Sequence, residues 1–172
     1  LFIPSNVIYG DLPPKPNLIA HRGASHLAPE DTIVAGKLAV EYGAVGWEVD
    51  IQISVDGELF LLHDDILTRT TNVEVIFPNR KNDRAETFTL SELRQLDAGS
   101  WFVDKDPYGA LFFGRISKED GDNYRGIQIP TFEEVLNFTR DNDFFIDFDT
   151  KLPSSSHLYS DVYFETILNE TI

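Results

Sequence analysis

The chain has 172 residues, of which 42% are hydrophobic and 12% aromatic, enough to bury the core of one folded domain. Its 29 acidic and 14 basic residues give a net charge of −15, which argues against the basic surface that nucleic-acid binding requires. The absence of cysteine excludes disulfides, thiolate zinc sites and cysteine nucleophiles. Because the chain as a whole repels anions, a phosphate site here would need a local cationic group or a bound metal.

The first part of the chain carries the signals of a strand followed by a helix. Residues 1–17 are rich in proline and are predicted to form an extended N-terminal segment. The apolar run 18–20 predicts a short buried strand that stops at His21. The helix that should follow is capped by Asp31 or Thr32, ends near Gly43, and presents Val34, Leu38 and Tyr42 on one face.

Two further strands are predicted between residues 47 and 62. Residues 47–53 alternate between apolar and polar side chains, which predicts a strand with two distinct faces. A tight-turn signal at Asp56-Gly57 leads into a strand over 59–62, which stops at His63. The polar face of the first of these strands carries Glu48, Asp50 and Gln52.

The second half of the chain is expected to be more irregular. Residues 65–88 are polar, and residues 99–129 are interpreted as a long loop rich in glycine and aspartate. Capping-box patterns that begin at Thr89 and Thr131 each predict a helix. The last elements are a strand over 144–151, with Asp147, Asp149 and Lys151 on one face, and a helix over 160–170. Because strands alternate with helices, we expect a parallel α/β sheet.

Charged and titratable side chains gather at the ends of these predicted strands. His21 ends the first strand, His63 ends the third, and Glu48 and Asp50 lie on one face of the second. Ligands bind at the C-terminal edge of parallel α/β sheets, so we expect these side chains to share one site. The last strand adds Asp149 and Lys151.

Each of these residue types has a chemical use in such a site. Two carboxylates on one face repel each other unless a hard divalent cation binds them, and oxygen ligands select Ca²⁺ or Mg²⁺ rather than zinc. The guanidinium of Arg22 is suited to bind phosphate oxygens. Two histidines can serve as a base and an acid near neutral pH. Taken one at a time, these residues could equally form a solvated strand face and a loop histidine, and no role is assigned to His26 or His157.

Several short motifs follow one another in a fixed order. They are His21-Arg22-Gly23-Ala24, Ala28-Pro29-Glu30-Asp31-Thr32, Gly46-Trp47-Glu48-Val49-Asp50, Asp56-Gly57, His63-Asp64 and Arg69-Thr70-Thr71, and then Ile129-Pro130-Thr131-Phe132 and Asp149-Thr150-Lys151. This ordered set resembles the glycerophosphodiester phosphodiesterase family. One position departs from it, because Asp31 stands where the family usually has asparagine.

The resemblance implies a TIM barrel of the phospholipase C-like phosphodiesterase type and hydrolysis of glycerophosphodiesters to glycerol phosphate and an alcohol. The substrate's own glycerol hydroxyl would be the nucleophile, giving a cyclic phosphate that water opens. Asp147 is the alternative third metal ligand, and Asp149 is preferred because of its spacing to Lys151. The implied roles are acid–base catalysis by His21 and His63, phosphate binding by Arg22 and Lys151, and coordination of Ca²⁺ or Mg²⁺ by Glu48, Asp50 and Asp149.

The length of the chain limits what the resemblance can cover. A TIM barrel takes about 250 residues, so residues 18–172 are expected to be the N-terminal part of the domain, with about four strands. The partner implied is a small or lipid-derived glycerophosphodiester, and no nucleic acid. Two other functions stay open: a non-catalytic module that holds a metal or a phosphorylated headgroup, and a phospholipase-type phosphodiesterase.

A finer resemblance bears on localisation. Residues 71–78 and 98–102 look most like the family branch whose catalytic domain lies outside the cell on a multi-spanning membrane protein. This implies an extracellular or cell-surface location, with membrane attachment through segments outside this chain and the cytoplasm as the alternative. Asn-x-Thr glycosylation signals occur at Asn137 and Asn169, and they would matter only in a secretory pathway that glycosylates.

Overall fold

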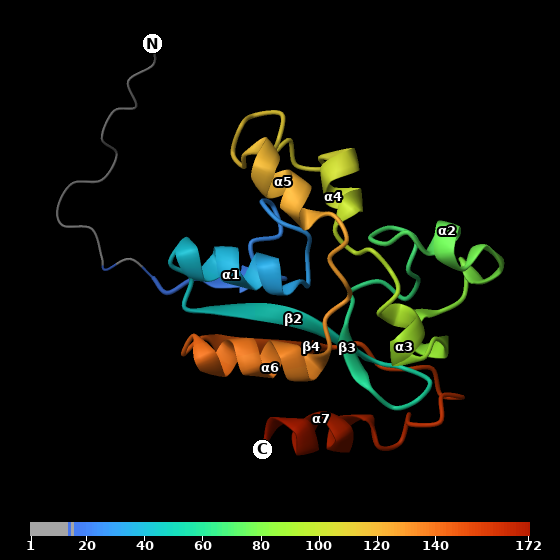
Figure 1. The fold of residues 1–172 in the computed structure, drawn as a ribbon. Helices are drawn as coiled ribbons and strands as arrows, with labels where there is room; N and C mark the ends of the chain where they lie inside the picture. Colours follow the sequence, from blue (N-terminus) through green and yellow to red (C-terminus); the bar gives the residue numbers. More distant parts are fainter. Residues whose placement is uncertain (1–13, 15) are drawn as a thin grey trace, which may run out of the picture.

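The computed structural model describes residue 14 and residues 16–172, so the predicted segment 1–17 lies mostly outside the described residues. The described part contains one sheet of four strands, flanked by helices (Figure 1). The strands are β1 (Ile19–His21), β2 (Gly46–Ile53), β3 (Leu59–Leu61) and β4 (Phe145–Thr150).

Strand β2 is the element on which the sheet is built. Strand β4 runs parallel to β2 over six residues, and β1 runs parallel to its first three residues on the other edge. Strand β3 pairs with the last three residues of β2 and is antiparallel. The expectation of an all-parallel sheet is therefore wrong for β3. A tight turn at Asp56-Gly57, with Gly57 at φ +89°, reverses the chain directly after β2, and a turn of this length can only join antiparallel strands.

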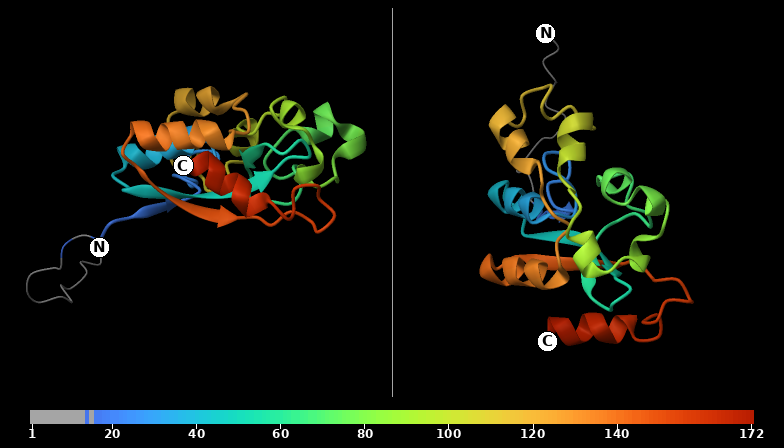
Figure 2. Two further views of the ribbon diagram at one scale, coloured as in Figure 1. Left: turned by 90° about the horizontal axis from the view of Figure 1, so that it is seen from below. Right: turned by 45° about the vertical axis from the view of Figure 1, so that its right-hand side comes forward.

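The apolar face of β2 lies under three helices. The side chains of α1 (Ile33–Glu41), α6 (Phe132–Asp141) and α7 (Tyr163–Thr171) pack against Trp47 and the other apolar residues of β2. The left view of Figure 2 shows α1 and α6 along the same side of the strands. The helices therefore leave the opposite face of β2, which carries the polar side chains, to form the site.

Helix α1 buries a different face from the one that the sequence indicates. The buried residues are Ala35, Gly36 and Ala39, whereas Tyr42 is 63% exposed. Small side chains lie on this face because α1 approaches the rings of Trp47 and Phe138 too closely for larger ones. The bulkier residues Val34 and Leu38 are partly buried in a separate apolar cluster with Phe102, outside the sheet.

The segment between β3 and α6 is more ordered than expected. Helix α2 (Val73–Ile76), two 3-10 turns (Pro78–Arg80 and Ala85–Thr87) and helix α3 (Leu90–Leu93) occupy the first part, and α4 (Ser100–Lys105) and α5 (Lys118–Tyr124) the second. The interpretation of residues 99–129 as one long loop is wrong, because α4 and α5 lie within it and its apolar side chains pack with Ala28 and Ala35 in a separate core cluster. The capping boxes predicted at Thr89 and Thr131 are confirmed. Among the described residues, no helix combines the length and the apolar character needed to cross a membrane.

The close contact between α1 and β2 yields a prediction about Gly36. Glycine to alanine normally stabilises an exposed helix interior by roughly 0.5–1 kcal/mol. A Cβ at residue 36 would lie 2.7 Å from Cζ3 of Trp47 and 2.8 Å from Cε1 of Phe138, in the core. We therefore expect Gly36→Ala to lower the free energy of unfolding by about 1–3 kcal/mol in urea titrations. Lys37→Ala, at the next and exposed position, is the control. An unchanged or raised free energy of unfolding for Gly36→Ala would contradict this packing.

Candidate active site

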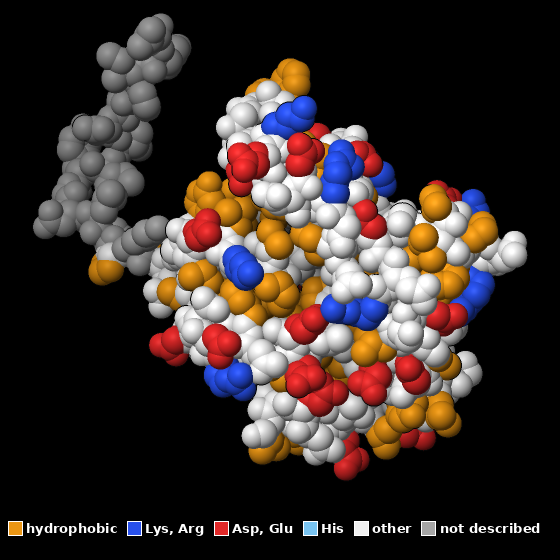
Figure 3. Space-filling view, in the orientation of Figure 1, with side chains coloured by type: hydrophobic (Ala, Val, Ile, Leu, Met, Phe, Trp, Pro, Cys, Tyr) orange, Lys and Arg blue, Asp and Glu red, His pale blue; other side chains and the backbone are white. Residues whose placement is uncertain are grey.

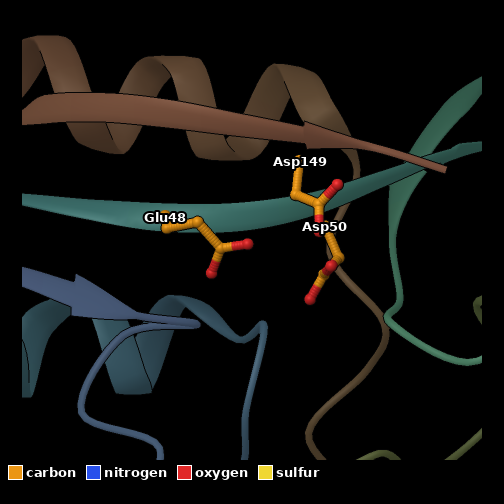
Figure 4. Close-up of side chains that lie close together, drawn as sticks. All are labelled: Glu48, Asp50 and Asp149. Carbon is orange, nitrogen blue, oxygen red and sulfur yellow. The ribbon is translucent and has the colours of Figure 1, made fainter.

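Three carboxylates from two strands meet on the polar face of the sheet. Glu48 and Asp50 extend from β2, and Asp149 extends from the neighbouring β4 beside Asp50 (Figure 4). One oxygen of each carboxylate lies within 4.8 Å of the others. Asp147, the alternative third ligand, is paired with Glu48 in the strand register and is not part of this cluster.

The carboxylate cluster fits a divalent cation by the chemistry of its donors. All three offer the hard oxygen ligands that Ca²⁺ and Mg²⁺ prefer. Asp50 is fully buried, and its two oxygens have ion-pair contacts with Arg22 and Lys151 but no hydrogen bond of good geometry among the described residues. Burial and then the nearby Asp50 carboxylate raise the pKa of Glu48. Positive charge at this point would relieve that repulsion, and the residues that would hold a metal are Glu48, Asp50 and Asp149.

Two cationic side chains contact the same buried carboxylate. Arg22 Nε lies 3.0 Å from Asp50 Oδ2, and Lys151 Nζ lies 2.9 Å from Asp50 Oδ1. Lys151 also lies 2.6 Å from Asp149 Oδ2, and this hydrogen bond lowers the pKa of Asp149. The two residues expected to bind phosphate are therefore held at the edge of the carboxylate cluster, one on each side of Asp50.

A strained turn after β1 aims Arg22 at the site. Arg22 and Gly23 both adopt left-handed backbone conformations, with φ +57° and +77°. Gly23 is required there because an added Cβ would lie 2.7 Å from Ala35. The Arg22 backbone N–H donates to the Glu48 side chain at 3.0 Å, so the turn also fixes that carboxylate.

The two candidate catalytic histidines reach the site from different strands. His21 ends β1, has a side chain that is 69% exposed, and places Nε2 3.8 Å from Glu48 Oε2. His63 comes directly after the antiparallel return, where the backbone N–H of Leu62 donates to the Asp50 carbonyl at 3.0 Å. The Gln52 amide donates to the carbonyls on either side of His63, those of Leu62 and Asp64, at 2.7 and 2.8 Å. The reversal of β3 is therefore what carries His63 back beside Asp50.

The structure adds a layer of residues to which reasoning from the sequence assigned no role. Arg69 contacts both Glu30 and Asp64, and Asp64 Oδ1 lies 2.7 Å from His63 Nδ1. Burial opposes ionisation of Asp64, but hydrogen bonds from Arg69 and His63 lower its pKa to about 2. These residues belong to the sequence motifs, and the adjacency of His63 and Asp64 was the available signal. His26 and His157 lie outside this arrangement: His26 stacks on Tyr108, and His157 bonds the Glu86 carbonyl.

The motif order and this geometry agree with a comparison against known protein families. The glycerophosphoryl diester phosphodiesterase family model matches residues 21–168. The chain belongs to this family. It is 39% identical over its whole length to the mouse protein glycerophosphoinositol inositolphosphodiesterase GDPD2, and 37% identical over 78% of its length to a glycerophosphodiester phosphodiesterase of Caldanaerobacter subterraneus.

Solved structures of the family have the same fold. The Oleispira antarctica phosphodiesterase, in complex with the product sn-glycerol-3-phosphate, matches 90% of the chain with a TM-score of 0.64 and 28% identity. The Agrobacterium tumefaciens glycerophosphodiester phosphodiesterase matches 90% with a TM-score of 0.61 and 27% identity. The expectation of a TIM-barrel phosphodiesterase fold is therefore confirmed, and the four strands are part of its sheet. The chain spans 31% of the mouse relative and 53% and 55% of the two solved structures.

A buried aspartate next to the carboxylate cluster yields a second prediction. Asp31 is buried at φ +55°, and its Oδ1 accepts a hydrogen bond from the Asp50 N–H at 3.2 Å, whereas Oδ2 has no partner among the described residues. Burial, and then the charge of Asp50, raise the pKa of Asp31 well above its usual range. The folded protein therefore binds a proton more tightly than the unfolded chain does, and its stability falls as pH rises above about 4.

We expect Asp31→Asn to be more stable than the wild type at pH 7 in metal-free buffer, by on the order of 1 kcal/mol for each unit of the pKa rise. The difference should vanish toward pH 3, where Asp31 is protonated in both states. Urea titrations over this pH range measure it. Asp143→Asn is the matched control, because Asp143 also has a left-handed backbone, at φ +48°, but is exposed. A wild type as stable as Asp31→Asn at pH 7 would show that the buried carboxyl carries no penalty.

Proposed function

We propose that this chain carries the acid–base and metal-binding residues of an enzyme that hydrolyses glycerophosphodiesters to glycerol phosphate and an alcohol, with a bound divalent cation. The observation that carries the proposal is the cluster of Glu48, Asp50 and Asp149 with His21 and His63 at its border. Family membership supports the same reaction. The name of the mouse relative makes glycerophosphoinositol a substrate to test first.

The charge of the molecule supports the requirement for a cation. On the face shown in Figure 3, lysine and arginine side chains are scattered among acidic ones rather than gathered into one patch. With a net charge of −15, the chain repels a phosphodiester at long range. A Ca²⁺ or Mg²⁺ ion held by the three carboxylates would supply local positive charge and Lewis-acid stabilisation of the developing charge on phosphorus.

The contacts of the two histidines support distinct roles for them. The Asp64 carboxylate can only accept a hydrogen bond, so the 2.7 Å contact requires a proton on His63 Nδ1 and leaves Nε2 free as a base. His21 is exposed, and its Nε2 lies 3.8 Å from Glu48 Oε2 at the border of the carboxylate cluster. We assign to His63 the removal of the proton from the attacking glycerol hydroxyl, and to His21 the donation of a proton to the departing alcohol.

The remaining residues would bind the phosphoryl group. Arg22 and Lys151 lie on either side of Asp50, and their N–H groups can donate to phosphoryl oxygens placed against the carboxylate cluster. In the first step the O–P bond to the glycerol hydroxyl forms and the bond to the alcohol breaks, which gives a cyclic phosphate. In the second step water opens this cyclic phosphate, with the two histidines exchanging roles.

The test compares histidine variants of the full-length protein on two substrates. We expect His63→Ala and His21→Ala each to lower the kcat for glycerophosphoinositol about 100-fold or more, the usual scale of acid–base catalysis. With a glycerophosphodiester of p-nitrophenol, whose leaving group needs no proton, His21→Ala should lose much less and His63→Ala as much as before. His26→Ala is the control, because His26 stacks on Tyr108 outside the site. Wild-type turnover should stop with EDTA and return with Mg²⁺ or Ca²⁺.

Three other outcomes would contradict parts of this proposal. Binding of Mg²⁺ or Ca²⁺ without turnover would support the non-catalytic module, and cleavage of intact phospholipid in preference to glycerophosphodiesters would support a phospholipase-type enzyme. Equal losses of the two variants on the p-nitrophenyl substrate would refute the assignment of His21 as the acid.

We also propose that the domain lies on the extracellular side of a membrane protein, with the cytoplasm as the alternative. The support is the resemblance of residues 71–78 and 98–102 to the multi-spanning branch of the family. Any membrane attachment would come from segments outside this chain.

The two glycosylation signals give a test of this location. Asn169 is exposed on α7, whereas Asn137 is only half exposed on α6 and the Thr139 of its signal is buried, with its hydroxyl bonded to the Val135 carbonyl. For protein expressed in animal cells we expect a glycan on Asn169 and none on Asn137, measured as a mass shift that glycosidase removes. Asn169→Gln should abolish the shift. Absence of a glycan on Asn169 in cells that glycosylate a secreted control protein would favour the cytoplasmic alternative.

A further inference from the structure

The guanidinium of Arg69 binds two carboxylates, those of Glu30 and Asp64, next to the site. Its Nη1 and Nη2 donate to the two oxygens of Glu30 at 2.9 and 2.7 Å, and its Nε and Nη2 donate to the two oxygens of Asp64 at 2.5 and 2.9 Å. Bidentate pairs of this kind fix the orientation of the carboxylate as well as its charge. Arg69 therefore sets the position of two acidic side chains at once.

Helix α4 holds Arg69 in place. The Lys105 ammonium donates to the Arg69 carbonyl at 2.9 Å, and the Arg69 guanidinium lies 5.9 Å from the Trp101 ring centre. Both residues belong to the segment that the sequence indicated to be a loop. The folded structure of that segment therefore affects the site, because two of its residues contact Arg69.

Each carboxylate held by Arg69 contacts a side chain of the proposed reaction. Asp64 lies against His63 Nδ1, and Glu30 Oε1 accepts a hydrogen bond from Arg22 Nη1 at 3.1 Å. Among the described residues, the Asp64 carboxylate has no hydrogen-bonding partner besides Arg69 and His63. Without Arg69, no other described side chain would hold this carboxylate at the imidazole.

We propose that Arg69 is a positioning residue for the reaction. Through Asp64 it keeps the proton of the neutral His63 ring on Nδ1 and the lone pair on Nε2, and through Glu30 it orients Arg22 toward the phosphoryl group. The catalytic consequence rests on the proposed function, whereas the effect on the His63 ring does not. The two can therefore be tested separately.

The first experiment reads the His63 ring proton by NMR on protein labelled with ¹⁵N-histidine, at a pH of about 8.5 where imidazole rings are neutral. The wild type should show the Nδ1–H form of His63. His157 is an internal reference of the opposite form, because its Nδ1 accepts the Tyr159 N–H at 3.2 Å and its Nε2 faces the Glu86 carbonyl at 3.2 Å. We expect Arg69→Met to give averaged shifts of both forms for His63 and to leave His157 unchanged.

The matched control is Arg80→Met. Arg80 also joins two carboxylates, those of Asp83 and Glu92, and stacks on an aromatic ring, but it contacts no residue of the site. The Arg80→Met variant should leave the Nδ1–H form of His63 unchanged. If Arg69→Met does not fold, Arg69→Lys replaces it, since an ammonium group keeps the charge but cannot bind both carboxylates in the bidentate way. An unchanged Nδ1–H form of His63 in a folded Arg69 variant would overturn the proposal.

The second experiment measures turnover and metal affinity in the same variants. We expect Arg69→Met to lower kcat at least about tenfold, with the affinity for Mg²⁺ or Ca²⁺ by calorimetry unchanged within about threefold, because Arg69 does not contact the three carboxylates. The double variant Arg69→Met, Asp64→Asn should lose less than the sum of the two single losses, since both changes remove the support of His63, whereas the route through Glu30 to Arg22 is lost only with Arg69. Fully additive losses would show that Arg69 does not act on the reaction through Asp64.

The outcomes separate the two proposals. If the wild type hydrolyses no glycerophosphodiester, the proposed function is wrong, and the ring-proton experiment alone decides the role of Arg69. If the wild type is active and the His63 ring is unaffected by loss of Arg69, the function stands and the positioning role is wrong.

Discussion

The buried carboxylate of Asp50 is the constraint on which the rest of the site depends. Its side chain is fully buried, and an ion that is removed from water costs several kcal/mol unless charged partners compensate it. Arg22 and Lys151 provide that compensation within 3.0 Å. The left-handed turn at Arg22 and the parallel pairing of β4 with β2 are the structural means by which these partners arrive. The proposed metal ligation and phosphate binding would thereby be coupled through one residue.

A charge network surrounds this carboxylate in two layers. The inner layer contains the carboxylates and the cations that contact them. In the outer layer, Glu30 contacts Arg22, Asp64 contacts His63, and Arg69 joins Glu30 to Asp64. Arginine is suited to the outer position because its fork binds two carboxylates with fixed geometry, which a lysine cannot do. This network accounts for part of the acidic composition of the chain. Several of its carboxylates orient cations and a histidine, whereas most surface carboxylates face solvent.

The antiparallel strand β3 contributes a residue to the site that parallel strands alone would not place there. Parallel strands place their C-terminal residues at one edge, and β1, β2 and β4 follow this rule. His63 reaches the same place because the turn at Gly57 sends the chain back along β2, and the Gln52 amide then holds the two carbonyls that flank His63. The segment after β3 packs into two further core clusters, which it shares with β3 and α1, and it supports Arg69 from α4.

The sequence by itself determined the parts of this protein that depend on local pattern. The alternation of residues 47–53, the capping boxes at Thr89 and Thr131, and the ordered motifs around His21, Glu48 and His63 were sufficient for the strands, the helix starts and the family. These features depend on neighbours in the chain, so a one-dimensional pattern contains them.

Only the tertiary structure decided which distant groups meet. The direction of β3, the small-residue face of α1 against Trp47, the order of residues 99–129 and the contacts of Arg69 all depend on partners far away in the sequence. The choice of Asp149 over Asp147 in the cluster is of the same kind, because both lie on one face of β4 and only the register with β2 separates them. Packing and charge compensation act through space, and their outcome is settled only when the whole chain has folded.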